Sequence, residues 1–251
     1  MKRVLAMLLV FTICLTLLPG TIAADLPFTD VKTADWFYND VKTAYESGLI
    51  NGKGDGVYKP DAFMTYAEAV KLAACMYQRY TTGAVSLKNG SPNWYQSYVD
   101  YAKANGVIQK DYDWNQPATR AGYMEIFANA LPEEALAPMN YVVDGGIPDV
   151  PKTHPQAAAI YKLYRAGILQ GSGGFKCNPG ASIKRSEVAA ILTRMMDSSK
   201  RISFSIGTPP RPVTPAEVPL TITTQPQDVT CKSGDTVTFS VAVAGGKAPY
   251  S

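Results

Sequence analysis

The chain has 251 residues, of which 46% are hydrophobic and 18% are charged, and its formal net charge at pH 7 is +3. This apolar content is enough for a buried core and excludes disorder as the default state. A charge this small, with no basic run that carries interleaved aromatic residues, excludes nucleic acid as an expected partner.

The N-terminus has the pattern of a secretory signal peptide. Lys2 and Arg3 precede an apolar run over 4–18, and a Pro-Gly pair and the small residues Ala23 and Ala24 follow. The run is shorter than the ~20 apolar residues of a membrane-spanning helix, which argues against the alternative of a membrane anchor. We predict that residues 1–24 are removed, that the mature protein is secreted, and that it has no membrane span.

The middle of the chain repeats itself. Residues 28–80 recur at 147–200 with a constant offset of 119 residues and no gap, and a shorter, looser copy lies between them. Repetition of this kind predicts stacked units, each too small to bury its own hydrophobic face. The predicted units span 26–80, 92–135 and 145–199.

Each unit reads as helix, loop, helix. In the first unit, Val41 and Ala44 share a helical face that ends at Gly48, and Thr65 and Glu68 form a capping box before the second helix. Six amphipathic helices are expected, so the predicted fold class is mainly α. Their apolar faces include Val70, Ala73, Tyr77, Val99, Ala102, Tyr123, Phe127, Ile160, Leu163, Val188, Ile191 and Leu192.

The loop between the two helices of a unit is rich in glycine, and Gly52 and Gly171 occupy matching places in it. Glycines leave backbone amides uncovered, so such a loop can hold an anion. A phosphate-binding loop is disfavoured because the GK[ST] ending is missing. The alternative is a tight connector between helices.

The composition changes after the third unit. Residues 200–219 contain five prolines, which predicts an extended linker. In 220–251, the stretches 220–224 and 236–243 alternate apolar and β-branched residues with polar ones, which predicts two strands. Two strands cannot close a sandwich, so we expect this part to be a truncated β domain.

The sequence shows no catalytic or metal-binding pattern. Cys75, Cys177 and Cys231 are widely spaced, so neither a metal, a cofactor nor a disulfide framework is expected. The sole histidine, His154, lies at an expected helix start, and the pair Glu133 and Glu134 lies at an expected helix end. We therefore predict that the chain is not an enzyme.

The pattern Phe28-x-Asp30-Val31, Trp36, Gly48-Leu49-Ile50-x-Gly52, Pro60 and Thr65-x-Ala67-Glu68, present in three variants, resembles the S-layer homology domain of bacterial surface proteins. The resemblance implies a pseudo-threefold bundle whose inter-repeat grooves bind, without a covalent bond, secondary cell wall polysaccharide that carries pyruvate ketals. It also implies a location at the cell wall or surface layer of a Gram-positive type of envelope. The segment from Leu220 resembles the first strands of a bacterial immunoglobulin-like domain.

The resemblance also implies site residues. The Arg of the family's Thr-Arg-Ala-Glu motif is a ligand contact, and this chain has it at Arg120 and at Arg185, which follows Lys184. A guanidinium offers paired donors to a ketal carboxylate at a helix N-terminus. Spacing alone favours the interpretation that Arg120 and Arg185 are solvated residues at helix ends. Their place in the repeats favours a ligand contact instead. In the first unit, Tyr66 replaces the arginine, and a phenol cannot neutralise a carboxylate.

Two tryptophans and two aspartates complete the candidate site. The rings of Trp36 and Trp94 could stack on a sugar while Asp30 and Asp149 accept its hydroxyls. For the aspartates, a structural role as caps of the first helix or of the turn before it is equally open. For the tryptophans, packing in the core between repeats is favoured.

The leading functional hypothesis is a carbohydrate-binding anchor that fastens an exported protein to the cell wall through a peptidoglycan-linked glycan. Alternatives are a helical array that binds other proteins, a scaffold that self-associates in a surface lattice, and the targeting part of a larger surface enzyme. Units of roughly 50 residues disfavour a tetratricopeptide array, whose units are near 34 residues.

Overall fold

The structure is a computed structural model that describes residues 26–208 and 219–246. The predicted signal peptide and the central part of the proline-rich segment lie outside these residues. The chain divides between Gly207 and Thr208 into a helical unit and a second, smaller unit, and each is considered by itself.

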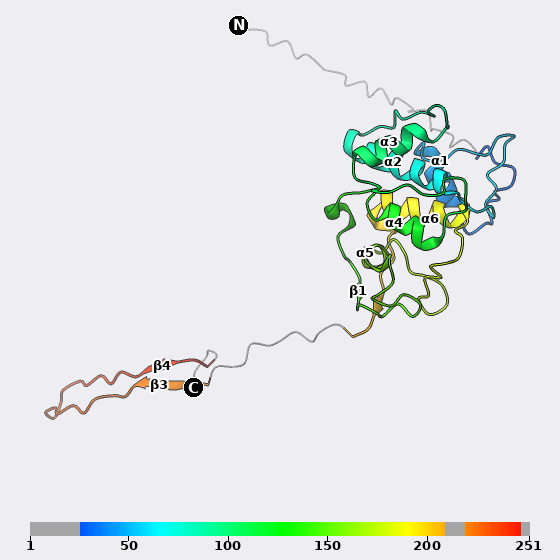
Figure 1. Cartoon of the computed structure of the whole chain (residues 1–251). Helices are drawn as coiled ribbons and strands as arrows, with labels where there is room; N and C mark the ends of the chain where they lie inside the picture. Colours follow the sequence, from blue (N-terminus) through cyan, green and yellow to red (C-terminus); the bar gives the residue numbers. More distant parts are fainter. Residues whose placement is uncertain (1–25, 209–218, 247–251) are drawn as a thin grey trace, which may run out of the picture. The chain divides into compact units, whose positions relative to one another are not determined.

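The helical unit confirms that the chain is mainly α (Figure 1). The described residues form six α-helices: α1 Tyr38–Glu46, α2 Tyr66–Thr82, α3 Gln96–Ala104, α4 Arg120–Phe127, α5 Ala157–Arg165 and α6 Arg185–Met196. Two short 3-10 helices, η1 Glu133–Leu136 and η2 Ser198–Lys200, follow α4 and α6. None of the helices within 26–208 and 219–246 has the length and apolar character to span a bilayer.

The helix ends follow from local sequence. At α2, the Glu68 amide donates to Thr65 Oγ1 and the Thr65 amide donates to Glu68 Oε2 at 3.0 Å, so the predicted capping box is present. At α4, Thr119 Oγ1 accepts from the Gly122 amide at 3.0 Å, and Gly122 has no side chain to return a second bond. Gly48 has a φ of +73° just after α1, which a residue with a side chain rarely adopts.

The helices pair between the predicted repeats. α3 packs on α2, α5 packs on α4, and α1 packs on α6. The last pair joins helices from opposite ends of the helical unit in the sequence. The first helix of each repeat is therefore covered by the second helix of the preceding one, with the last repeat preceding the first. α1, the first described α-helix of the unit, thus packs on α6, the last one.

Three backbone hydrogen bonds form a closed cycle. Each joins the residues just before α2, α4 and α6: the Met64 amide donates to Ile183 O (3.0 Å), the Ile183 amide to Ala118 O (3.2 Å), and the Ala118 amide to Met64 O (2.7 Å). All three residues are buried. The starts of α2, α4 and α6 are thus held together by main-chain hydrogen bonds, which do not depend on side chains.

The core contains almost all of the predicted apolar faces. Val41, Ala44, Val99, Ile160 and Leu163 are buried, as are the inward positions of α2, α4 and α6. Cys75 and Cys177 are buried free cysteines, and Cys231 is exposed. The two buried thiols therefore act as small apolar groups.

The predicted linker begins too early. Residues 205–206 form β2, which pairs in parallel with β1, Tyr141–Val142. The buried Asn140 side chain holds the same segment by donating to Ile202 O at 2.9 Å and accepting from the Phe204 amide at 3.0 Å. The residues up to 207 therefore belong to the helical unit.

The second unit has one antiparallel strand pair, β3 Thr221–Thr224 with β4 Ala242–Ala244. The first predicted strand is confirmed, but the second lies at the end of the predicted range and not over 236–243. The apolar side chains of Ile222, Phe239 and Val241 are exposed. Without an opposing apolar layer, the alternating pattern over 236–241 does not by itself produce a strand.

Candidate functional site

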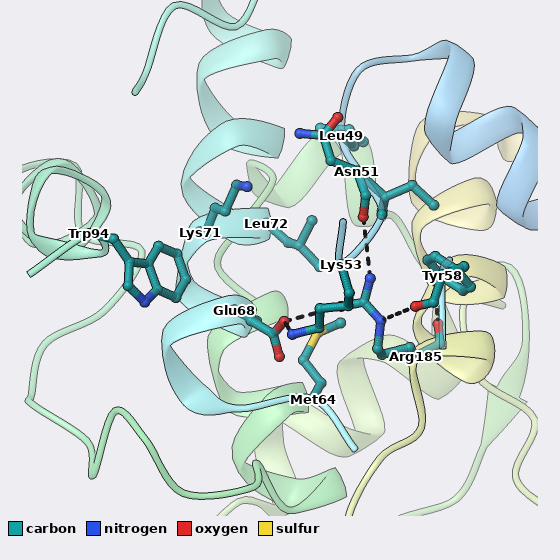
Figure 2. A pocket seen from close by; sticks show the side chains of 12 residues that line it. Leu49, Asn51, Lys53, Tyr58, Met64, Glu68, Lys71, Leu72, Trp94 and Arg185 are labelled. Atoms are coloured by element: carbon teal, nitrogen blue, oxygen red, sulfur yellow. Dashed lines mark hydrogen bonds and ion pairs between the residues drawn. The ribbon is translucent and has the colours of Figure 1, made fainter. Parts of the chain in front are cut away.

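Two pockets in the helical unit bring six of the ten candidate residues together. The first, here the α2 pocket, has a volume of about 90 Å³ and is lined by the loop 49–53, Glu68 and Lys71 of α2, Trp94 and Arg185 (Figure 2). The second, here the α6 pocket, has a volume of about 180 Å³. Its lining includes the loop 169–171, Glu187, Ala190, Arg120 and Trp36.

The two pockets are built alike. Glu68 corresponds to Glu187 and Gly52 to Gly171 at the offset of 119 residues. In each pocket the glycine loop and the glutamate come from one repeat and the arginine from another, while the tryptophan lies near the start of a third helical segment. Sequence neighbours alone could not form either pocket, because three distant segments contribute to it.

Arg185 is held on several sides by the protein. Its Nε donates to Tyr58 O at 2.8 Å, Nη1 to Glu68 Oε1 at 3.1 Å, and Nη2 to Asn51 O at 3.3 Å. The guanidinium also lies 4.7 Å from the centroid of the Tyr58 ring. Only 7% of the side chain is exposed. Arg185 therefore fastens the glycine loop to α6 and does not present an open pair of donors.

Glu68 forms ion pairs with two cations in the α2 pocket. Besides Arg185, it pairs with Lys53 and accepts a hydrogen bond from the Thr65 amide. Burial acts to raise the pKa of the Glu68 carboxyl, but the Lys53 hydrogen bond, the Thr65 amide and the charges of Lys53 and Arg185 together lower this pKa below its ordinary value. The carboxylate is thus ionised at neutral pH and anchors both cations.

Arg120 in the α6 pocket makes contacts like those of Arg185 in the α2 pocket. Its Nε donates to Cys177 O at 2.7 Å, and its Nη1 lies 2.5 Å from Glu187 Oε1. Cys177 corresponds to Tyr58 at the same offset. This pair is more open, because 34% of the Glu187 side chain is exposed.

The tryptophans are not core residues, so that part of the sequence interpretation is wrong. Trp36 is 66% exposed and Trp94 is 38% exposed. The residue after each one turns inward instead, and its ring meets the indole edge to face, with centroids 5.3 Å apart for Trp36 and Phe37 and 5.5 Å apart for Trp94 and Tyr95. Both indoles are therefore available at the pocket walls.

The two aspartates hold backbone amides that follow them by about 28 residues. Asp30 accepts from the amides of Tyr58 (2.8 Å) and Lys59 (2.7 Å). Asp149 accepts in the same way from the amides of Cys177 and Asn178. Lys59 and Asn178 have φ values of +58° and +53°. The carboxylates thus hold a tight turn in the loop, about 28 residues further along the chain, and do not cap the first helix.

Tyr66 fills the place that an arginine takes in the two pockets. Its ring stacks on Tyr112 with centroids 4.9 Å apart, and its hydroxyl lies 3.3 Å from Thr119 Oγ1. Gly122 follows Thr119 by three residues, as Glu68 follows Thr65 and Glu187 follows Lys184, and a Cβ there would lie 2.3 Å from the Tyr66 hydroxyl. The Tyr66 phenol therefore occupies the space that Gly122 leaves free. The junction between α2 and α4 is filled by the stacked rings of Tyr66 and Tyr112.

Of the remaining candidates, Gly52 and Gly171 line the pockets and Lys184 does not. Lys184 Nζ instead pairs with Asp61 at 2.8 Å, and its amide caps α6 through Glu187. The sequence analysis missed Lys53 and Lys71. Lys71 lies three residues after the cap residue Glu68, on the side of α2 that faces the pocket, and this spacing is the signal that could have found it.

His154 and Glu133, a member of the acidic pair Glu133 and Glu134, make contacts within the protein. His154 Nδ1 accepts from the Gln156 amide at 3.2 Å just before α5, and Glu133 pairs with Lys162 at 2.7 Å. Among the residues that the structure describes, no three metal-ligating side chains gather in one place.

Comparison with known proteins gives one family and several relatives. The family model of the S-layer homology domain matches residues 27–70 and 146–189. The chain is 26% identical over 117 residues to the surface-layer 125 kDa protein of Lysinibacillus sphaericus, covering 43% of this chain and 10% of that protein. It is 30% identical over 139 residues to a cell surface protein of Thermoanaerobacter kivui, covering 54% of this chain and 17% of that protein.

An endoglucanase of Bacillus sp. (strain KSM-635) is also similar, with 31% identity over 104 residues, 41% of this chain and 11% of the enzyme. The matched regions thus span between 10% and 17% of the length of these relatives. The chain therefore carries the S-layer homology domain at two positions, 27–70 and 146–189, which together with its relatives supports a location at the cell wall and surface.

Proposed function

We propose that this chain is the wall-anchoring part of an exported surface protein, and that it binds a wall-linked polysaccharide without a covalent bond in the α2 and α6 pockets. The observation that carries the proposal is that two alike pockets each combine an exposed indole with a glycine loop and a bound Arg–Glu pair. An indole face beside polar and charged groups suits a sugar ring. The family match agrees with this function.

The proposal includes a third, divergent repeat over 92–135 and a pseudo-threefold arrangement of the three. The cyclic hydrogen bonds among Met64, Ala118 and Ile183 support this arrangement, as does the packing of α1 on α6. The repeat over 92–135 lies outside the residues that the family model matches, and its junction with Tyr66 lacks the charged pair. We therefore expect two binding pockets in each chain.

The polymer that we propose carries acidic groups such as pyruvate ketals. The α2 pocket supports this, because Lys53, Lys71 and Arg185 outnumber the single carboxylate of Glu68. Some relatives are named as enzymes and are far longer than the matched region. The anchor could thus serve proteins with quite different partners, and we place any catalysis outside the helical unit. The strand pair β3/β4 is the part that we assign to an immunoglobulin-like domain.

Cosedimentation with Gram-positive wall sacculi tests the proposal. The chain should pellet with intact sacculi and should stay in solution when the non-peptidoglycan polymer has been stripped from them. Replacing both indoles, Trp36→Ala with Trp94→Ala, should abolish pelleting. Phe63→Ala is the matched control, because Phe63 is 52% exposed and lies outside both pockets. Equal binding to stripped sacculi would show that the ligand class is wrong.

A further inference from the structure

The cation expected to bind the ligand in the α2 pocket, Arg185, is already occupied. Its three donor atoms bond to Tyr58 O, Asn51 O and Glu68, and its side chain is almost fully buried. Lys53 is also paired with Glu68. An anionic group that entered the pocket would have to share each of these two cations with the Glu68 carboxylate.

Lys71 is the third cation of this pocket, and its situation differs. It lies on α2 and is half-buried, with its ammonium 5.8 Å above the centroid of the Tyr98 ring. No carboxylate of the described residues lies within ion-pair distance of it. In the view of Figure 2, Lys71 stands between Trp94 and the loop that carries Asn51. A positive charge without a carboxylate partner therefore lies at the pocket wall beside an exposed indole.

We propose that Lys71 makes the contact with an anionic substituent of the saccharide in the α2 pocket, while Arg185 holds the pocket together. This inference rests on the proposed function. Trp94 offers its face to the apolar side of the sugar ring, and the ammonium offers three donors to a carboxylate or a phosphate. Because an ammonium is a compact point charge, it accepts either geometry.

The two pockets then differ in ligand preference. The residue that corresponds to Lys71 in the α6 pocket is Ala190, and the residue that corresponds to Lys53 is Ser172. The α6 pocket has Arg194 in its lining, but Arg194 Nη1 donates to Ile168 O at 3.1 Å. The α2 pocket should therefore bind acidic saccharides more tightly than the α6 pocket does.

The indole N–H resonances of Trp94 and Trp36 report on the two pockets separately, so NMR titration of the whole chain tests the inference. Three probes are needed: a methyl hexoside with a 4,6-pyruvate ketal, the same hexoside with a neutral isopropylidene acetal, and a methyl hexoside 6-phosphate. Lys71→Ala should weaken binding of the ketal at Trp94 about tenfold and leave Trp36 unchanged. The neutral acetal should bind the variant and the parent equally.

Two further variants make the test specific. Lys88→Ala removes an exposed lysine outside both pockets and should change nothing. Ala190→Lys should tighten ketal binding at Trp36. Tighter binding of the phosphate than of the ketal at Trp94, lost in Lys71→Ala, would support the contact and identify phosphate as the substituent.

The outcomes separate this inference from the proposed function. If both indoles respond to the saccharides and Lys71→Ala binds the ketal as tightly as Lys88→Ala does, Lys71 is not the contact, but the pockets remain saccharide sites. If neither indole of the parent chain responds to any probe, and the chain also fails to pellet with sacculi, the proposed function falls and this inference falls with it.

Discussion

Arg185 and Arg120 each join segments that are distant in the sequence. Arg185 contacts Tyr58, Asn51 and Glu68, which all precede it by more than 110 residues. Removal of one partner from a buried ion pair leaves the other partner and several backbone acceptors without a donor. The energetic role of these arginines is therefore to hold distant segments of the helical unit together.

Arg185→Ala should lower the free energy of unfolding by about 3 kcal/mol, as measured by urea denaturation. Arg120→Ala should cost less, since its partner Glu187 is more exposed. Arg185→Lys should recover only part of the loss, because a single ammonium cannot reach three acceptors placed around a planar group. A change below about 0.5 kcal/mol for Arg185→Ala, the range of ordinary surface substitutions, would return Arg185 to the solvated helix-end reading.

The lowered pKa of Glu68 gives stability a pH dependence. Since the folded-state pKa lies below the ordinary value of 4.5, the ionised carboxylate stabilises the fold above that value. The contribution is lost as pH falls through the lowered pKa. Urea unfolding between pH 7 and pH 3 should therefore show a loss in the parent that is smaller in Glu68→Gln, while Glu134→Gln, which removes an exposed carboxylate, serves as the control. Equal acid slopes for all three proteins would contradict the prediction.

At the scale of elements, the glycine loops let the chain pass close to the core. Gly171 has a φ of +76°, and a Cβ there would lie 2.4 Å from the Tyr164 hydroxyl and 2.5 Å from Lys176 O. Gly174, in the same loop, has the same φ, but a Cβ there would meet nothing within 4 Å. The two positions thus share backbone strain and differ only in space.

Gly171→Ala should destabilise the protein by about 2–4 kcal/mol, which combines the left-handed strain with overpacking, and Gly174→Ala should cost only about 1 kcal/mol. Thermal unfolding of both variants measures the difference. Because Gly171 lines the α6 pocket, its variant should also weaken saccharide binding at Trp36. Similar melting temperatures for the two variants would show that a Cβ at position 171 is accommodated without overpacking, and would contradict the prediction.

At the scale of the molecule, the proposed pseudo-threefold arrangement has three junctions, of which two carry pockets with an Arg–Glu pair. The third is closed by Tyr66, Tyr112 and the absence of a side chain at Gly122. Tyr66→Ala should therefore leave saccharide binding at Trp36 and Trp94 unchanged, as followed by their indole resonances. A loss of binding at either indole equal to that of Lys71→Ala would mean that the third junction takes part.

The second unit should differ from the helical unit in stability. Its apolar residues Ile222, Phe239 and Val241 are exposed, and its strand pair covers only a few residues. An isolated strand pair of this kind is marginal in water. Amides of 221–224 should exchange with solvent orders of magnitude faster than those of α2. Protection comparable to that of α2 would contradict this expectation.

The sequence by itself determined the helices, their caps and their buried faces. Apolar spacing, the pair Thr65 and Glu68, and the glycine after α1 act over a few residues, so the pattern is visible locally. It also determined the correspondence of Gly52 with Gly171 and of Tyr66 with Arg185, because the offset of 119 residues needs no gap.

Only the tertiary structure decided what those residues touch. Helical periodicity shows that a face is buried but not which helix covers it, so the packing of α1 on α6 could not be read from the pattern. For the same reason, Trp36 and Trp94 were expected in the core, and Arg185 was expected to be open. Contacts across more than 100 residues depend on how the helices pack, and that packing places Glu68 against Arg185 and leaves Lys71 without a carboxylate partner among the described residues.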